Sequence, residues 1–159
     1  LFRDVQYTTI EHNLCEFNAE GLFFYSSTEN TVRYNRVAHN QVGAKIWAGS
    51  VRNVVSDNAF VGNRRQIVYV GSSDLVLGQD GPGNLWSDYV GWDQDGDGIG
   101  DRPFRVDSFT TNLMVRYPSA ALLTRSPALE LLGHLEQRLP LLRVATVVDL
   151  QPQMHLEVP

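Results

Sequence analysis

The chain has 159 residues, of which 43% are hydrophobic, and its 13 basic and 18 acidic residues give a formal net charge of −5. This composition is too apolar and too weakly charged for a disordered chain, and it can supply a buried core. An acidic chain lacks the basic face that neutralises phosphates, so we expect no nucleic-acid partner. No apolar run approaches the roughly 20 residues of a membrane-spanning helix, so we expect no membrane span.

Residues 10–69 contain three copies of one pattern, with steps of 22 and 23 residues between them. Each copy starts at an apolar residue and carries Asn three and eight positions later. Further apolar residues follow five, twelve and fourteen positions after the start. The copies start at Ile10, Val32 and Val55, and their asparagines are Asn13, Asn18, Asn35, Asn40, Asn58 and Asn63. Short apolar strands between Asn or Gly corners are typical of a β-helix coil, which buries its inward row only by stacking. We therefore predict an all-β solenoid over residues 1–79, a right-handed parallel β-helix with about 22 residues per coil.

The asparagines are expected at the corners of the coils, because Asn tolerates the left-handed backbone conformation and stacked amides can form ladders. A fourth copy is not expected after Leu77, because Asp80, Pro82 and Leu85 interrupt the pattern. No capping helix precedes the first coil, so we expect these coils to be the end of a longer solenoid.

The outward positions of the coils do not predict a catalytic site. Polysaccharide-cleaving β-helices need carboxylates that converge on one face. The pattern places acids next to basic, polar or apolar residues in the neighbouring coils, as in the triplets Glu11, Arg33, Ser56; His12, Tyr34, Asp57; and Glu16, Ala38, Val61. We predict no catalytic residue here. Cys15 is expected to be a small core side chain.

The whole negative charge comes from residues 80–107, which contain seven Asp and two Arg. Within this segment Asp93, Asp95, Asp97, Ile99 and Asp101 occupy positions 1, 3, 5, 7 and 9 of an EF-hand-type calcium loop. Position 12 is Phe104, so the usual bidentate Glu is absent, and Asp88 or Asp107 could replace it. The sequence predicts a Ca²⁺ site, and the alternative is a solvated Asp-Gly turn without an ion.

Three aromatic residues precede this loop: Trp86, Tyr89 and Trp92. They are expected to cap the open end of the last coil or to contact a partner, because such side chains are too apolar to leave in water. The alternative is an aromatic platform for a sugar.

Residues 108–159 are predicted to form a helical C-terminal segment with an apolar tail. Ser126 and Pro127 are typical of a helix start, leucines follow at four-residue spacing, and Pro140 ends the helix. A helix this short must dock, either on the solenoid end or on a partner. In the tail, the adjacent Met154 and His155 are the soft and imidazole ligands that copper prefers.

Residues 84–89, Asn-Leu-Trp-Ser-Asp-Tyr, and the acidic run 93–101 resemble the closing motif of NosD-type periplasmic β-helix proteins, whose repeats are often described as carbohydrate-binding and sugar-hydrolase-like. The segments 116–121, 126–128, 140–142 and 148–149 resemble the C-terminal region of the same family, so the resemblance covers essentially the whole chain.

The resemblance implies a periplasmic, non-enzymatic maturation factor for nitrous oxide reductase. It implies ABC transporter subunits, a copper chaperone and the reductase as partners, and copper or sulfur supply to the copper centres as the task. The alternative function is a polysaccharide-binding or polysaccharide-cleaving β-helix protein.

Overall fold

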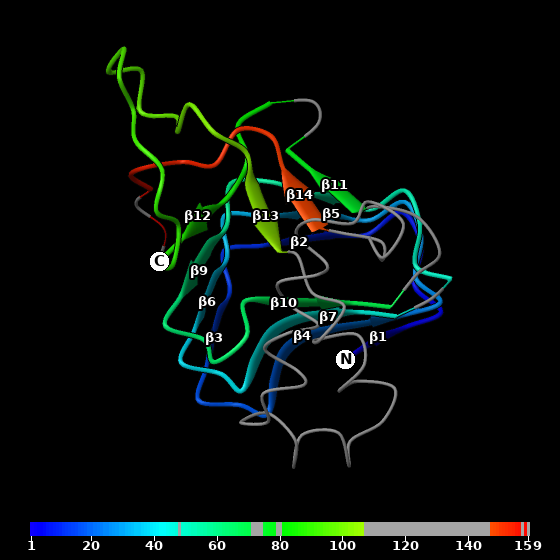
Figure 1. Cartoon of the computed structure of the whole chain (residues 1–159). Coiled ribbons are helices and arrows are strands. Elements are labelled where there is room, and N and C mark those ends of the chain that lie inside the picture. The colour runs from blue at the N-terminus through cyan, green and yellow to red at the C-terminus, as the bar shows by residue number, and fades with distance from the viewer. Residues whose placement is uncertain (48, 71–74, 79–80, 107–146, 157, 159) are drawn as a thin grey trace, which may run out of the picture.

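Short strands follow one another along the chain, and most pair in parallel with the strand one repeat further on (Figure 1). The computed structural model describes residues 1–47, 49–70, 75–78, 81–106, 147–156 and 158. One sheet has the order β1 (Phe2–Arg3), β4 (Glu20–Tyr25), β7 (Val42–Ile46) and β10 (Ile67–Tyr69).

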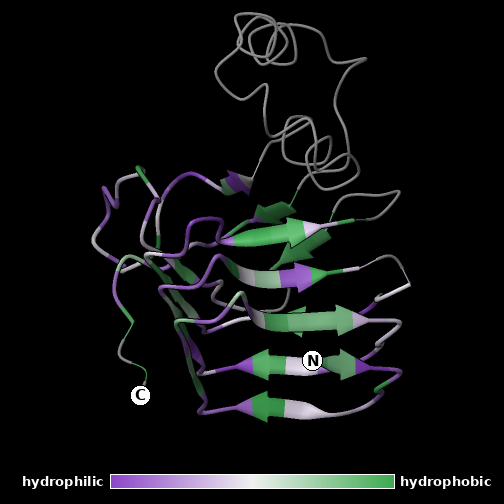
Figure 2. Ribbon diagram, turned by 90° about the horizontal axis from the view of Figure 1, so that it is seen from below, coloured by the Kyte–Doolittle hydropathy of each residue, from purple (hydrophilic) through white to green (hydrophobic). Residues whose placement is uncertain are grey.

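Two further sheets complete the coils. The second contains β2 (Thr9–Glu11), β5 (Thr31–Arg33) and β8 (Val54–Val55), and the third contains β3 (Leu14–Glu16), β6 (Arg36–Ala38), β9 (Ala59–Val61) and β12 (Leu85–Trp86). Figure 2 shows successive strands stacked above one another. The protein is thus an all-β parallel solenoid of about three turns, as the repeat predicts.

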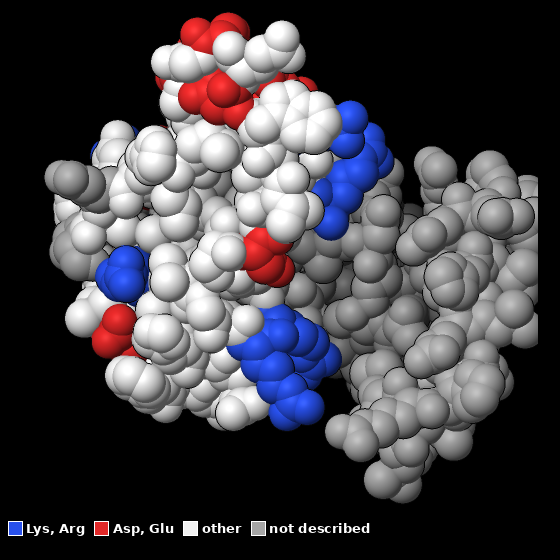
Figure 3. Space-filling view, turned by 60° about the vertical axis from the view of Figure 1, so that its left-hand side comes forward, with Lys and Arg blue, Asp and Glu red and all other residues white. Residues whose placement is uncertain are grey.

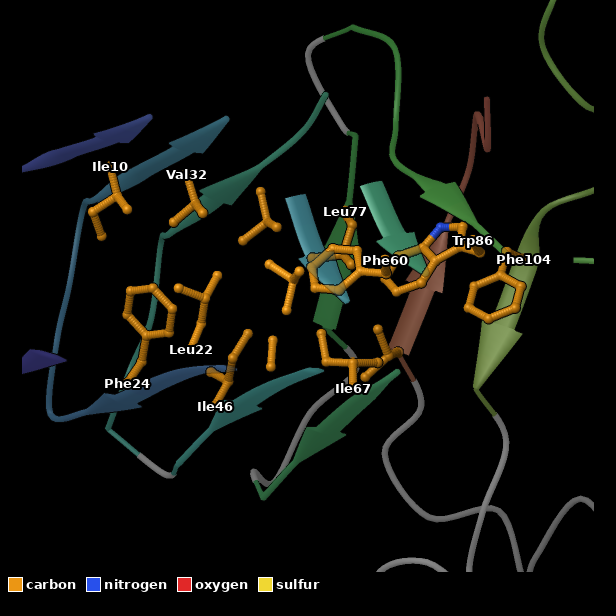
Figure 4. Close-up of a cluster of buried hydrophobic side chains, with 14 residues drawn as sticks. Ile10, Leu22, Phe24, Val32, Ile46, Phe60, Ile67, Leu77, Trp86 and Phe104 are labelled. Carbon is orange, nitrogen blue, oxygen red and sulfur yellow. The ribbon is translucent and has the colours of Figure 1, made fainter. Parts of the chain in front are cut away.

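The strand register confirms the repeat residue by residue. Ile10 pairs with Val32, and Val32 pairs with Val55. Their side chains form one inward column, and the aromatic and aliphatic side chains of the other sheets form parallel columns (Figure 4). Val32, Val37 and Phe60 are fully buried. Burying each such side chain contributes roughly 1.5–3 kcal/mol, which only stacked coils can provide.

The prediction that the asparagines themselves adopt the left-handed backbone conformation is wrong. The left-handed conformation belongs instead to the residue before each Asn: φ is 56° at His12, 54° at Tyr34 and 53° at Asp57. None of the asparagines of the described coils has a positive φ. The preceding residue makes the turn, so the Asn side chain is free to point along the stack toward the next coil.

The expected ladders are present. Nδ2 of Asn13 donates to Oδ1 of Asn35, and Nδ2 of Asn35 donates to Oδ1 of Asn58, each at 2.9 Å. A second column joins Asn40 to Asn63 in the same way. A third column, from Asn30 to Asn53, was not predicted.

The third sheet continues beyond the third copy of the pattern. Leu85 and Trp86 pair in parallel with Ala59 and Phe60, and Asn58 donates to Asn84. Asn84 follows Asn58 by 26 residues, whereas Asn58 follows Asn35 by 23, so the coil is three residues longer (26 − 23). The interruption after Leu77 is therefore an insertion, after which the pattern resumes.

A last sheet lies at this end of the solenoid, with the order β11 (Leu75–Leu77), β14 (Val147–Asp149) and β13 (Phe104–Val106). β14 runs parallel to β11 and antiparallel to β13. The described residues contain no helix, and the helix predicted within residues 126–140 lies outside them. Among the described residues, no helix has the length and apolar character needed to cross a membrane.

Candidate functional site

The acidic segment forms a loop between β12 and β13 that projects from the C-terminal end of the solenoid (Figure 1). Figure 3 shows acidic side chains gathered on this projection. Asp93, Asp95 and Asp97 each bring one carboxylate oxygen within 4.8 Å of the others. Three carboxylates at this separation can converge on one hard cation, and a flexible all-oxygen site favours Ca²⁺ over Mg²⁺.

Backbone N–H groups hold this arrangement. The Asp93 carboxylate accepts hydrogen bonds from the N–H of Gly98 at 2.9 Å and of Gly96 at 2.7 Å. Gly96 and Gly98 have φ values of 78° and 86°, which a residue with a side chain rarely adopts. These hydrogen bonds, that of Gly98 foremost, lower the pKa of Asp93, so its carboxyl group stays ionised at neutral pH.

The other predicted members of the loop are engaged differently. Oδ2 of Asp101 accepts the N–H of Gln94 at 2.8 Å and thereby ties the two ends of the loop together. Ile99 forms an antiparallel bridge with Gln153. The converging set is therefore Asp93, Asp95 and Asp97.

Phe104 stands at loop position 12, where an EF-hand has its bidentate Glu, and its side chain belongs to the hydrophobic core. Phe104 is only 9% exposed, and its ring stacks on Trp86 with centroids 4.6 Å apart. Asp88 accepts a hydrogen bond from Gln66 at the end of the second Asn column. Asp107 lies outside the described residues.

The three aromatic residues occupy different environments. Trp86 is buried and lies between the rings of Phe60 and Phe104 (Figure 4). Tyr89 packs edge-on against Phe104 and donates its hydroxyl hydrogen to the carbonyl of Arg102 at 2.7 Å. Trp92 is 47% exposed, with the Arg102 guanidinium 4.0 Å from the centre of its ring.

The tail lies between the acidic loop and the last coil. Gln153 donates its backbone N–H to Asn84 and its side-chain amide to Asp57. On the other side, the N–H of Met154 donates to the carbonyl of Gly98 at 2.9 Å, and the N–H of Gly100 donates to Pro152 at 2.8 Å. The loop and the tail therefore depend on each other for their backbone partners.

The side chains predicted as copper ligands lie in the tail. Met154 is half-buried and the adjacent His155 is exposed. Cys15 packs against the core, and burial raises the pKa of its thiol, which disfavours the metal-binding thiolate. Within the described residues, the acid triad is the only group of three or more His, Cys, Asp or Glu side chains that converge. Cu(I) prefers soft ligands, which this triad of carboxylates does not offer. Met114 and His134 lie outside the described residues.

Sequence reasoning missed Asp149, which is fully buried. Its Oδ2 accepts hydrogen bonds from the Asn84 backbone and from Nε1 of Trp86, at 2.7 and 2.9 Å. The available signal was a single acid after two valines in an otherwise apolar stretch. A lone acid there is costly unless it is hydrogen-bonded, so its position indicated a partner.

Known proteins resemble this chain over most of its length. The family model described as "Periplasmic copper-binding protein (NosD)" matches residues 1–91. Over 140 residues the chain is 41% identical to the "Probable ABC transporter binding protein NosD" of Pseudomonas aeruginosa, covering 87% of this chain and 33% of that protein. It is 39% identical over 137 residues to the protein of the same name from Stutzerimonas stutzeri, covering 86% and 31%. The chain thus spans about a third of the length of the curated relatives it matches, and it belongs to the NosD family, which is described as periplasmic and copper-binding.

Proposed function

We propose that this chain is part of a non-enzymatic periplasmic accessory protein that helps to mature the copper centres of nitrous oxide reductase, acting with an ABC transporter in copper or sulfur delivery. The observation that carries this proposal is the family membership, with about 40% identity to two proteins named as probable ABC transporter binding proteins. The copper chaperone and the reductase are proposed as further partners.

The coil surface supports a non-enzymatic role. Glu11 pairs with Arg33 at 2.9 Å and Glu20 with Lys45 at 2.6 Å, each one coil apart. Glu29 accepts a hydrogen bond from Nε of Arg52 at 2.8 Å, and this contact lowers the pKa of Glu29. A glycosidase needs two carboxylates that flank its substrate. On the described coils these three acids are instead neutralised by basic neighbours.

The acidic loop is proposed to bind a structural Ca²⁺ ion through Asp93, Asp95 and Asp97, with the Ile99 carbonyl and Asp101 as outer members of the site. The convergence of the three carboxylates and the loop's backbone contacts with the tail support this assignment. A bound cation would neutralise part of the local charge and hold the loop against residues 152–154.

Any copper contact from this part of the protein is proposed to be transient and to use Met154 and His155. Two adjacent donors cannot complete a Cu(I) site, so the partner must supply the remaining ligands. Trp92, exposed beside the loop, is the proposed partner contact of the aromatic group. The predicted helix within residues 126–140 is proposed to dock on the transporter's periplasmic side.

The function is tested by complementation in a denitrifying host whose corresponding gene is deleted. The full-length protein should restore the copper content and the visible spectrum of the purified reductase. A Met154→Ala, His155→Ala double variant should lower the copper content, whereas an Arg64→Ala variant on the coil surface should not. Reductase with its full copper content from the deletion host would contradict the proposal.

The exposed Trp92 beside Arg102 keeps glycan binding as a second candidate function. Aromatic faces next to a cation suit acidic sugars. Retention on acidic polysaccharides that is lost in Trp92→Ala would favour this function over maturation.

A further inference from the structure

The acidic loop contains two Asp-Gly pairs in succession, Asp95–Gly96 and Asp97–Gly98. In such a pair the amide nitrogen of the glycine can attack the side-chain carboxyl group of the aspartate, because glycine has no Cβ to obstruct the approach. Every other aspartate among the described residues is followed by a residue that carries a side chain. Ring closure between a side chain and the next peptide nitrogen is therefore least hindered at these two pairs.

The space around the two glycines is open. A Cβ added to Gly96 or to Gly98 would meet nothing within 4 Å. At the base of the loop, by contrast, a Cβ added to Gly100 would overlap the ring of Tyr89. The aspartates of both pairs are exposed, so water can leave and enter. Neither the room for a ring nor the access of water limits the reaction here.

Asp93 holds both glycine nitrogens. Its Oδ1 accepts the N–H of Gly96 at 2.7 Å, and its Oδ2 accepts the N–H of Gly98 at 2.9 Å. For attack on the preceding side chain, the nitrogen must give up its proton and the peptide plane must turn toward the carboxyl group. Both changes break the hydrogen bond to Asp93. One side chain therefore restrains the reaction at both pairs.

We propose that Asp95–Gly96 and Asp97–Gly98 are sites of spontaneous conversion to isoaspartate, and that the carboxylate of Asp93 slows this conversion. The glycine nitrogen forms a bond to Cγ of the aspartate and loses its proton, while a Cγ–O bond breaks and one water leaves. The product is a cyclic succinimide. One water then opens the ring. Where it breaks the original peptide bond, the chain continues through Cγ and the residue becomes isoaspartate. The composition of the chain is unchanged, and no electrons are transferred.

The conversion changes the contact between the loop and the tail. Isoaspartate adds Cβ to the main chain immediately before the glycine. At Asp97 this addition displaces Gly98, whose N–H donates to Asp93 and whose carbonyl accepts the N–H of Met154 at 2.9 Å. Isoaspartate at Asp97 thus separates the tail from the loop slowly and without a partner or a bound ion.

The test follows isoaspartate in the full chain during incubation at one pH. A chelator is present throughout, so the result does not depend on a Ca²⁺ site. Tryptic digestion and electron-transfer fragmentation locate isoaspartate at each pair. The folded chain should form it more slowly than the chain in urea. Asp93→Ala should raise the rate in the folded chain at both pairs by roughly fivefold, the factor that one hydrogen bond contributes.

Asp93→Asn is the matched variant, because it removes the same charge but keeps one acceptor oxygen. It should raise the rate at only one of the two pairs. Asp4→Ala, which removes an exposed acid outside the loop, should change neither rate. Circular dichroism verifies that each variant keeps the fold of the wild type. Amide hydrogen exchange of Met154 should be faster in chains converted at Asp97 than in unconverted chains.

Four results would overturn the proposal. Equal rates in the wild type and Asp93→Ala would remove the restraint by Asp93. The absence of isoaspartate from both pairs in urea would show that they are not conversion sites. Equal acceleration at both pairs by Asp93→Ala and Asp93→Asn would attribute the effect to the lost charge instead of the hydrogen bonds. Unchanged exchange at Met154 after conversion at Asp97 would contradict the separation of the tail.

Discussion

The carboxylate of Asp149 takes the place that an asparagine would have in the next coil above Asn84. Its Oδ2 accepts the Asn84 backbone N–H at 2.7 Å and Nδ2 at 3.1 Å. The two residues are 65 positions apart in the chain. This contact joins β14 and the tail to the stack of coils. The packing of the C-terminal end of the solenoid therefore depends on one buried acid.

Replacing Asp149 by Ala should lower the free energy of unfolding by about 3 kcal/mol, because the buried Asn84 and Trp86 donors lose their acceptor. Asp149→Asn keeps one acceptor oxygen and should cost less. Urea unfolding followed by tryptophan fluorescence measures both, with the exposed Asp4→Ala as the control. An Asp149→Ala variant as stable as this control would show that the contact does not hold the end together.

Gly83 lies against the same carboxylate. A Cβ added to Gly83 would overlap the side chain of Asp149, whereas a Cβ on Gly81 would meet nothing within 4 Å. Gly83→Ala should therefore cost on the order of 2 kcal/mol or more, and Gly81→Ala should be nearly neutral. Urea midpoints of this matched pair give the comparison, and equal losses would mean that the backbone conformation matters here rather than the space.

The fold could be predicted from the sequence where each coil repeats the same local chemistry. Ile10, Val32 and Val55 share an inward position because the period of 22 or 23 residues is written in the sequence. The positive φ of Tyr34 could not be foreseen, because residue type does not favour it and the stacked coils impose it.

The candidate site, too, could be predicted only where its geometry follows from local spacing in the sequence. The convergence of Asp93, Asp95 and Asp97 follows from their alternate spacing and from the glycines between them. The roles of Phe104 and Asp149 depend on partners far away in the chain, Trp86 and Asn84, which no local pattern specifies.

The buried asparagines should contribute unequally to stability. The fully buried Asn35 donates to Ile10, Arg33 and Asn58, and accepts from Asn13. Asn35→Ala should cost about 3 kcal/mol, because several buried partners lose their hydrogen bonds. The exposed Asn13→Ala should cost less than about 1 kcal/mol. Thermal unfolding of the two variants tests this order, and a larger loss for Asn13 would contradict it.

If the acidic loop binds Ca²⁺, the ion should stabilise the folded protein by RT ln(1 + [L]/Kd), where [L] is the free Ca²⁺ concentration. The Tm rises by this free energy divided by the entropy of unfolding. At a hundredfold excess over Kd the gain is about 2.7 kcal/mol, or roughly 5–10 °C. Asp95→Asn should remove most of this difference, while Asp4→Asn, an exposed acid outside the loop, should keep it. Differential scanning calorimetry with Ca²⁺ and with a chelator makes the measurement, and identical curves for the wild type would refute a calcium site.

The pKa of Asp93 gives the acidic loop a defined response to acid. Hydrogen bonds from the N–H groups of Gly98, Gly96 and Asp97 favour the ionised carboxylate and lower the pKa below its ordinary value of 3.8. Because the folded pKa is the lower one, the stabilisation is fully present above pH 3.8 and is lost as the pH falls through the folded value. We expect the carboxyl carbon of Asp93, followed by NMR without Ca²⁺, to titrate with a midpoint below 3.8. The amide resonances of Gly96 and Gly98 should shift over the same pH range, and Asp93→Asn should abolish that shift. A midpoint at or above 3.8 would mean that these hydrogen bonds do not persist in solution.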